Sequence, residues 1–296
     1  MAVQVVIRDT RVPGNLRAMK LSPRGWYVQY GSITSSRCSQ TVQQAGLHIS
    51  RVADVIYGKL FRQRQAGRYC GMSALELDNP FWASLCTRHQ ALALRMNGAA
   101  RYPAEFAPFL GVASADVDAT KAIESLMGPG EALYLLGVVP KVTSGWVIKA
   151  HGPLAQMICT TPMPVIDGPK VIELSAAHRE DVLALTALVY PHYFRPCTME
   201  LGRYFGIYQD GRLAAIIGER LGMDAYQEIS AVCTHSDFSG RGYARRLLAR
   251  LSNDNLERGR VPFLHVSHQN HRAKRLYEQV GYRHRRNIDF WSLCRA

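Results

Sequence analysis

The sequence predicts an α/β fold, and three observations carry that prediction. From Val171 to the end of the chain, short apolar runs alternate with patterns of helical period. The dipeptide Asp210-Gly211 stands between two apolar runs, which is a strong signal for a β-hairpin. The stretch EISAVCTHSDFSGRGYARRLLARL, residues 228–251, begins as an apolar strand, passes through two glycines and continues as a basic helix with a leucine stripe.

The elements after Val171 follow a regular order. This region begins with a strand in KVIEL, a helix in AAHREDVLALTALVY capped by Ser175, and two hairpin strands in YFGIYQDGRLAAIIGERL. The strand YQEISAVCT, the basic helix stopped by Gly259 and Pro262, the strand PFLHVS, the helix NHRAKRLYEQV ended by Gly281 and the strand RNIDFWSLC follow. The predicted order is therefore β, α, β-hairpin, β, α, β, α, β.

Residues 72–168 also read as mixed α/β. We expect helices in PFWASLCTRHQALALRM and VDATKAIESLM, and strands in ALYLLGVV and WVIKAHGPLAQMICT. The segment TTPMPVIDGPK, residues 160–170, has three prolines and one glycine and indicates a linker. The predicted domains are thus a smaller half at 72–168 and a second domain at 169–296.

Residues 1–71 differ from the rest of the chain. They hold 11 Lys and Arg against two acids, Asp9 and Asp54, and no glutamate. One interpretation is a basic arm with a targeting or binding role. The other, which the weak periodicity favours, is a disordered upstream extension from start-site choice, without an evolved function.

Composition limits the class of protein. The chain has 296 residues, 47% of them hydrophobic, and a formal charge of +13, most of it in the leader. The body after the leader fits an enzyme with an anionic ligand as well as a nucleic-acid binder. Seven scattered cysteines without a C-x-x-C pair argue for a reducing compartment and against a disulfide framework or a zinc site. Without a long apolar run or a signal peptide, we expect a cytoplasmic protein that does not bind a membrane.

The turn after the strand at 226–234 predicts a phosphate site. A strand that enters a glycine-bearing loop and then a helix directs unpaired N–H groups and the positive end of the helix dipole at one point. Gly240 and Gly242 allow close backbone approach, and Ala244 keeps the first helical turn small. One alternative is a tight joint without a ligand. A dinucleotide fold fits less well, because the pattern G-x-G-x-x-R lacks the third glycine.

The same residues resemble the GNAT N-acetyltransferase superfamily, whose loop follows [Q/R]-x-x-G-x-[G/A]. In SGRGYA, Gly242 and Ala244 match the last two fixed positions, whereas Ser239 stands where Gln or Arg is usual. The resemblance covers residues 171–296 and is nearest to the branch of glycine N-acyltransferase-like proteins. It implies a GNAT fold, with a mixed central sheet flanked by helices, preceded by a smaller degenerate α/β half.

The resemblance also implies the acyl donor, acetyl-CoA, and its contacts. Backbone groups of Val232, Cys233 and Thr234 would pair with the pantetheine arm and polarise the thioester carbonyl. The pyrophosphate would take the backbone amides of the loop and first helical turn. These residues are Gly240, Arg241, Gly242, Tyr243, Ala244 and Arg245.

Two side chains are candidates for the chemistry. Tyr277 matches the tyrosine that similar enzymes use as general acid, and helical spacing sets Asn270, Lys274 and Tyr277 on one face toward the cofactor. The alternative for Tyr277 is a half-buried helix aromatic. Glu228 is the candidate general base, directly or through water, or else a solvated charge at the strand edge. His235 is a weaker candidate for the base.

A metal site is not expected. His265, His268 and His271 lie on a strand and the loop after it, which would direct them apart, and no acid joins them at ligand spacing.

The predicted function is an acetyl-CoA-dependent N-acetyltransferase that transfers an acetyl group to a primary amine of a small molecule or peptide by direct attack on the thioester. The alternative is a catalytically silent acyl-CoA-binding regulatory module. Nucleic-acid binding through the leader is disfavoured, and a homodimer is left open. Candidates for the wall of the acceptor pocket are Pro191, His192, Tyr193, Phe194 and Arg195.

Overall fold

A computed structural model gives the structure of the chain and describes residues 4–8, 16–22, 25–29, 75–189 and 193–296. The chain divides into two compact units, Met1–Tyr69 and Cys70–Ala296. None of the described helices is both long enough and apolar enough to cross a membrane.

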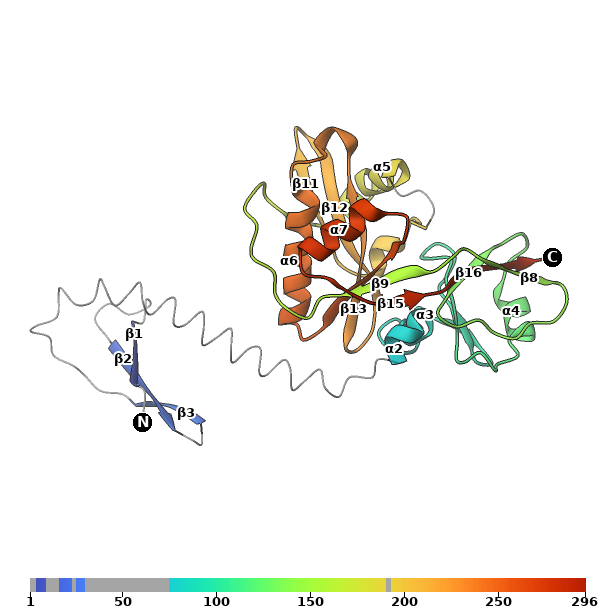
Figure 1. Cartoon of the computed structure of the whole chain (residues 1–296), viewed down its shortest axis with the longest axis horizontal. Coiled ribbons are helices and arrows are strands. Elements are labelled where there is room, and N and C mark those ends of the chain that lie inside the picture. Colours follow the sequence, from blue (N-terminus) through green and yellow to red (C-terminus); the bar gives the residue numbers. More distant parts are fainter. Residues whose placement is uncertain (1–3, 9–15, 23–24, 30–74, 190–192) are drawn as a thin grey trace, which may run out of the picture. The chain divides into compact units, whose positions relative to one another are not determined.

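The first unit contains an antiparallel three-stranded sheet (Figure 1). Its strands are β1 (Gln4–Arg8), β2 (Leu16–Ser22) and β3 (Gly25–Gln29). The rest of the predicted extension 1–71 lies outside the described residues, so its nature stays a prediction.

The second unit begins with two short helices and a small antiparallel sheet. Its first elements are α2 (Leu75–Asp78), α3 (Pro80–Cys86), β4 (Leu94–Met96), β5 (Ala99–Arg101), β6 (Leu110–Val112), α4 (Thr120–Leu126), β7 (Leu133–Leu136), β8 (Trp146–Ala150) and β9 (Leu154–Ile158). The helix α4 and the strand β7 lie where helix and strand were predicted.

The long helix predicted over residues 80–96 is wrong. The helix α3 ends at Cys86, and β4 and β5 form a hairpin in which Met96 pairs with Ala99. The turn residues are Asn97, with φ 41°, and Gly98, with φ 79°. Asn-Gly is the preferred pair for such a two-residue turn because both residues tolerate positive φ, so turn chemistry overrode the helical pattern.

The elements after Val171 follow the predicted order. They are β10 (Ile172–Leu174), the 3-10 turn η1 (Ala176–His178), α5 (Arg179–Val189), η2 (Thr198–Leu201), β11 (Tyr204–Gln209), β12 (Arg212–Gly222), β13 (Tyr226–Thr234), η3 (Ser236–Phe238), α6 (Tyr243–Glu257), β14 (Val261–Ser267), α7 (His271–Gln279), β15 (Arg283–Ile288) and β16 (Phe290–Arg295). The hairpin at Asp210-Gly211 is confirmed, with φ 53° and 72° at the two residues. Pro262 does not stop the basic helix. It lies inside β14, after Gly259 with φ 75° has turned the chain.

Seven strands form the central sheet in the order β10, β11, β12, β13, β14, β9, β15. The pair β13 and β14 is parallel, and the other neighbouring strands are antiparallel. Helices α6 and α7 share a core with one face of the sheet, and α5 packs with the other (Figure 1). Leu247, Leu248 and Leu251 of α6 are fully buried, and burial of each side chain contributes about 2 kcal/mol. The predicted α/β class is confirmed.

Two strands cross between the predicted halves. Strand β9 pairs with both β14 and β15, although it comes from the first half. Strand β16 leaves the central sheet and pairs with β7 and β8. Each crossing divides a predicted strand in two, at His151-Gly152-Pro153 and at Asp289. In Figure 1, β9 and β15 run side by side toward the part of the unit that holds β8 and β16.

The predicted linker 160–170 has no regular structure and packs on α6. The backbone N–H of Met163 donates to Oδ1 of Asn253 at 2.8 Å, and Nδ2 of Asn253 donates to the Met163 carbonyl at 2.8 Å. The domain limit between 168 and 169 stays a prediction, and the strands β9 and β16 link the two sides of it.

The strand crossing predicts that residues 169–296 do not fold alone. Without β9, the backbone N–H and C=O groups of β14 and β15 that face it lose their partners, and such edges aggregate. We expect residues 70–296 to unfold cooperatively on heating and residues 169–296 to show no cooperative transition, as measured by circular dichroism. A sharp transition in the shorter piece would contradict the structural role of β9.

Candidate active site

Strands β13 and β14 separate soon after they meet. They pair in parallel over Tyr226–Glu228 and Val261–Phe263, and no later rung joins them in the described residues. Strand β14 continues to Ser267 against β9 on its other side. The two strands therefore diverge after Glu228 and leave backbone groups of β13 without a strand on this side.

A bulge lies in β13 at the opening. Ala231 has φ 49°, and the pairing with β12 shifts between Gly218, opposite Ser230, and Ile216, opposite Cys233. An extra residue in one strand bends that strand and turns the following backbone groups. The predicted backbone contacts at 232–234 thus follow directly after the bend.

A cavity of about 440 Å³ occupies the space between the diverging strands. Strands β13 and β14, helix α7 and the cap residue of α7 supply one part of the cavity lining: Glu228, Ile229, Ser230, Ala231, Val232, Cys233, His265, Val266, Ser267, Asn270 and Tyr277. From β12 and the rest of the chain, it is lined by Phe81, Phe109, Leu136, His151, Leu154, Val189, Tyr193, Arg220 and Phe290. Of the proposed wall residues, Tyr193 lines the cavity, Phe194 packs edge-to-face on Tyr204, and Pro191 and His192 lie outside the described residues.

The glycine loop lies between η3 and α6. Gly240 has φ 80° and Gly242, the residue before the helix, has φ 78°. A Cβ atom at either position would meet open space, so the need for glycine comes from the backbone angle and not from crowding. The amides that begin this 15-residue helix are unpaired within the helix, which suits an anion.

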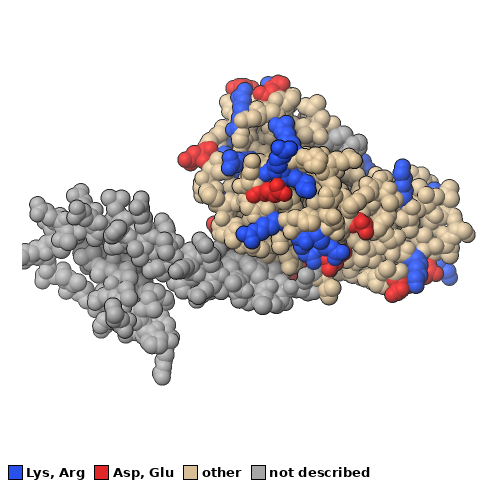
Figure 2. All heavy atoms as spheres, in the orientation of Figure 1, with Lys and Arg blue, Asp and Glu red and all other residues tan. Residues whose placement is uncertain are grey.

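The side chains of the loop have different surroundings. Arg241 and Arg212 lie over the ring of buried Phe238, at 5.1 and 5.0 Å from its centroid. Tyr243 is buried and donates to Oε1 of Gln209 at 3.3 Å. Arg245 is exposed. Figure 2 shows Lys and Arg side chains on the face that carries α6 and α7, with a few acidic side chains among them. The predicted residues 240–245 and Thr234 do not line the cavity, whereas Val232, Cys233 and Asn270 do.

Helix α7 presents two predicted residues to the cavity. Asn270 caps the helix, since its Oδ1 accepts from the backbone N–H of Ala273 at 3.0 Å, and it also lines the cavity. Tyr277 lies two turns later, is 8% exposed and contacts the ring of Tyr282 with centroids 6.0 Å apart. Lys274, which was predicted on the same face, does not line the cavity.

Glu228 is a buried, paired carboxylate and not a charge at a solvated edge. Arg220 donates from Nε to Oε2 at 2.7 Å and from Nη2 to Oε1 at 2.8 Å, and Nδ1 of His265 lies 2.8 Å from Oε1. Burial alone would raise the pKa of Glu228, but Arg220 and His265 outweigh it and lower the pKa to about 2. This carboxylate therefore stays ionised at neutral pH, and it is a weaker base than an ordinary glutamate.

A row of polar side chains, which sequence reasoning missed, continues across the sheet from Glu228. Nε2 of His265 lies 3.0 Å from Nε2 of Gln156, whose Oε1 accepts from Nη1 of Arg285 at 2.8 Å. Arg285 in turn donates to Oδ1 of Asp78 at 2.7 Å. Gln156 and His265 are 109 residues apart, so no local pattern could have joined them.

His265 and His268 have separate partners. His265 bonds to Glu228 and Gln156, whereas Nε2 of His268 lies 2.9 Å from Oδ1 of Asn287. Among the residues that the structure describes, no three His, Cys, Asp or Glu side chains are grouped to hold a metal ion. The other candidate base, His235, accepts from the backbone N–H of Asp237 at its Nδ1, which caps η3.

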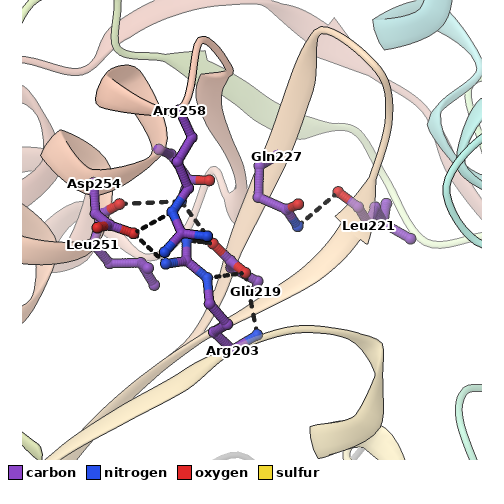
Figure 3. Close-up of polar contacts among 8 residues, drawn as sticks. Arg203, Glu219, Leu221, Gln227, Leu251, Asp254 and Arg258 are labelled. Carbon is purple, nitrogen blue, oxygen red and sulfur yellow. Dashed lines mark hydrogen bonds and ion pairs between the residues drawn. The ribbon is translucent and has the colours of Figure 1, made fainter. Parts of the chain in front are cut away.

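A second ionic cluster fixes the far end of α6 (Figure 3). Arg203 donates to both Glu219, which is 3% exposed, and Asp254, and Arg258 donates to Asp254 at 3.1 Å. Asn255 adds a 2.8 Å bond to Glu219. These contacts tie the last turns of α6 to β12, about 18 to 20 Å along the helix from Gly242.

The chain resembles a known protein family and several solved structures. The model of the FR47-like protein family matches residues 204–291. A solved structure from Novosphingobium aromaticivorans, assigned to the GNAT family of acetyltransferases, shares 31% identity with a TM-score of 0.67, over 74% of this chain and 98% of its own. GCN5-related N-acetyltransferase structures from Kribbella flavida (16% identity, 71% and 95% coverage, TM-score 0.48) and, described as N-acetyltransferase-like, Streptococcus suis (14%, 72% and 93%, 0.45) are more distant. A search of curated proteins gave no match.

The depressed pKa of Glu228 predicts an acid-sensitive fold. Folding lowers this pKa, so the ionised carboxylate stabilises the fold fully above about pH 4.5, and its contribution is lost as the pH falls toward 2. Glu228→Gln should cost about 3–5 kcal/mol at pH 7, since it leaves Arg220 without its buried anion. It should also lose less stability than the wild type between pH 4.5 and 2.

Urea midpoints at several pH values measure both effects, with the exposed Glu124→Gln as the control. Parallel acid curves for the wild type and Glu228→Gln would show that Glu228 does not set the acid sensitivity.

Proposed function

Because the chain belongs to the GNAT family of acetyltransferases, we propose that it transfers an acetyl group from acetyl-CoA to a primary amine of a small molecule or peptide. The observation that carries this proposal is the cavity between the diverging strands β13 and β14, which Glu228 and Tyr277 both line. Direct attack of the amine on the thioester needs donor and acceptor in one cavity, and residues proposed to contact each of them line this one.

The chain has backbone groups suited to acetyl-CoA. The diphosphate would take the amides from Gly240 to Arg245, where two positive φ angles curl the loop ahead of α6. The pantetheine arm would lie along β13 at 232–234, where β14 has moved away and an extended ligand can add as a strand. Acetyl-CoA supplies the activated thioester, and an N–H after the bulge would polarise its carbonyl.

Tyr277 is the proposed general acid. A thiolate with an ordinary pKa near 8.5 needs only a modest proton donor when it leaves, and a phenol near 10 serves in a site with little water. The placement of Tyr277 and Asn270 on the same cavity, two helical turns apart, supports this role.

Glu228 is proposed to bind and orient the acceptor. Its low pKa keeps it negatively charged, so it attracts a protonated amine and aligns the neutral amine by a hydrogen bond. As a weak base it would pass the proton of the amine on to water. Of the two routes that the sequence left open, direct or through water, this proposal favours the route through water.

The silent acyl-CoA-binding module lacks support. Binding alone requires the loop and β13, whereas a carboxylate and a phenol on one cavity are what transfer requires in addition. Membership of the glycine N-acyltransferase-like branch remains part of the proposal, and it rests on the α/β half before Val171.

Replacement of Tyr277 tests the acid. Tyr277→Phe keeps the ring and removes the proton, so kcat should fall about 100-fold while acetyl-CoA still binds. The measurement is CoA release with a panel of amines, alongside calorimetry with acetyl-CoA. The matched control is Tyr282→Phe, a buried neighbour whose hydroxyl bonds Ser252 at 2.7 Å. It should lose about 1 kcal/mol of stability but no activity. An unchanged kcat in Tyr277→Phe would remove this residue from the mechanism.

Replacement of the loop glycines tests the diphosphate site. In the double variant Gly240→Ala, Gly242→Ala, each alanine would have to hold a φ near +80°, which costs about 1–2 kcal/mol per residue, so the loop should rearrange. We expect the affinity for acetyl-CoA in calorimetry to fall at least tenfold.

The control is the double variant Gly130→Ala, Gly145→Ala, two glycines with positive φ and open space around the Cβ position. It carries similar backbone strain away from the loop and should bind acetyl-CoA normally. Equal affinity in both double variants would contradict the proposed diphosphate site.

A further inference from the structure

Five neighbouring strands each contribute one side chain to the polar row that begins at Arg220. The row runs from Arg220 on β12 through Glu228 on β13, His265 on β14 and Gln156 on β9 to Arg285 on β15. The centre of the row is buried, because the side chains of Glu228, His265 and Gln156 are exposed by 3% or less. In such surroundings each donor must face an acceptor.

Both ends of the row are arginines at irregular points of the sheet. The pairing of β12 with β13 shifts between Glu219 and Gly222, around Arg220. The pairing of β15 with β9 shifts between His284 and Arg286, which leaves Arg285 as the extra residue. A bulge redirects a side chain, and here each bulge brings a guanidinium into line with the row.

The two arginines fix the direction of every hydrogen bond between them. Arg285 can only donate, so the atom of Gln156 that faces it must be the carbonyl oxygen Oε1. The amide Nε2 then donates to the Leu77 carbonyl at 2.8 Å and to Nε2 of His265. His265 must accept at Nε2, so its proton lies on Nδ1 and is donated to Glu228.

This tautomer matters for the orientation of the Glu228 carboxylate. Oε1 of Glu228 receives two donors, Nη2 of Arg220 and Nδ1 of His265, and Oε2 receives Nε of Arg220. With the opposite tautomer, a lone pair of His265 would face the carboxylate and repel it. The carboxylate would then turn, and its remaining acceptor site on Oε2 would lose its direction.

We propose that Gln156 is a positioning residue of the acetyl-transfer site, which donates to Nε2 of His265 and, together with the ionised Glu228 at Nδ1, fixes the ring so that Glu228 keeps one orientation toward the acceptor. This role rests on the function proposed above. Gln156 reaches the site only because β9 inserts between β14 and β15, and it lies outside residues 204–291, which match the family model.

The tautomer can be read directly. In the full-length chain labelled with ¹⁵N-histidine, two-bond ¹H–¹⁵N correlation at pH 7.5 distinguishes the two neutral forms, and His265→Gln identifies the signal by its loss. We expect wild-type His265 to show the Nδ1–H pattern. An Nε2–H pattern in the wild type would overturn the proposal, whatever the variants do.

Kinetics test the consequence. Gln156→Met removes the donor to Nε2 of His265 and leaves Glu228 alone to hold the ring, so we expect the ring and the carboxylate to lose their fixed orientation and kcat/KM for the acceptor to fall about tenfold, with KM for acetyl-CoA unchanged. The acceptor is the fastest amine from a CoA-release panel of phenethylamine, spermidine, L-lysine and a tripeptide with a free amino terminus.

The control is Gln227→Met. Gln227 is equally buried, lies next to Glu228 on β13 and donates to the Leu221 carbonyl at 3.2 Å (Figure 3). It should lose less stability than Gln156→Met, which breaks three hydrogen bonds, and should keep the Nδ1–H pattern of His265 and kcat/KM. Unchanged kcat/KM in a folded Gln156→Met would overturn the positioning role alone. No CoA release from the wild type with any amine would overturn the proposed function itself.

Discussion

The divergence of β13 from β14 is the constraint on which the site depends. The two strands share three rungs and then separate, with Glu228 on the last shared rung and the backbone proposed for the thioester, 232–234, beyond it. The bulge at Ala231 bends one strand away, and β9 holds the other by pairing with it up to Ser267. Without both effects the sheet would close, and hydrogen bonds between neighbouring strands would fill the space where the cavity lies.

The buried charges follow from the same opening. An ionised carboxylate beside a cavity in the middle of a sheet is costly unless donors surround it, and Glu228 meets this condition through Arg220 and His265. At the other end of α6, Arg203 and Asp254 hold the helix to the sheet by the same principle. The helix that begins at the glycine loop is thus fixed at the end opposite the loop.

Much of the second half could be predicted from sequence because its signals are local. The strand at 226–234 agrees with β13 residue for residue, and the Asp210-Gly211 hairpin and the leucine face of α6 are confirmed. The errors have two kinds, one in each half. The Asn97-Gly98 pair is a clear turn signal, but the apolar residues before it follow a helical period, and the helix was predicted through them. The break at Asp289 carries no strong local signal.

The site could be predicted only in part for a similar reason. Glu228 and Tyr277 stand in elements with clear local patterns, and both line the cavity. The pairing of Glu228 with Arg220 could not be found, because the two residues face each other across an irregular strand pair. The contact of His265 with Gln156 could not be found either, because Gln156 lies on β9, a strand from the first half. Pairing between distant segments depends on packing of the whole sheet, which no short window of sequence contains.

The composition of the cavity wall has a consequence for how such a protein diversifies. Phe81, Phe109, Leu136, His151 and Leu154 belong to the segment before Val171, whereas the backbone suited to the thioester belongs to the segment after it. Under the proposed function, substitutions in the earlier segment would change the shape of the acceptor side of the cavity and leave the residues that bind acetyl-CoA unchanged. Selectivity for new amines could then evolve without rebuilding the donor side.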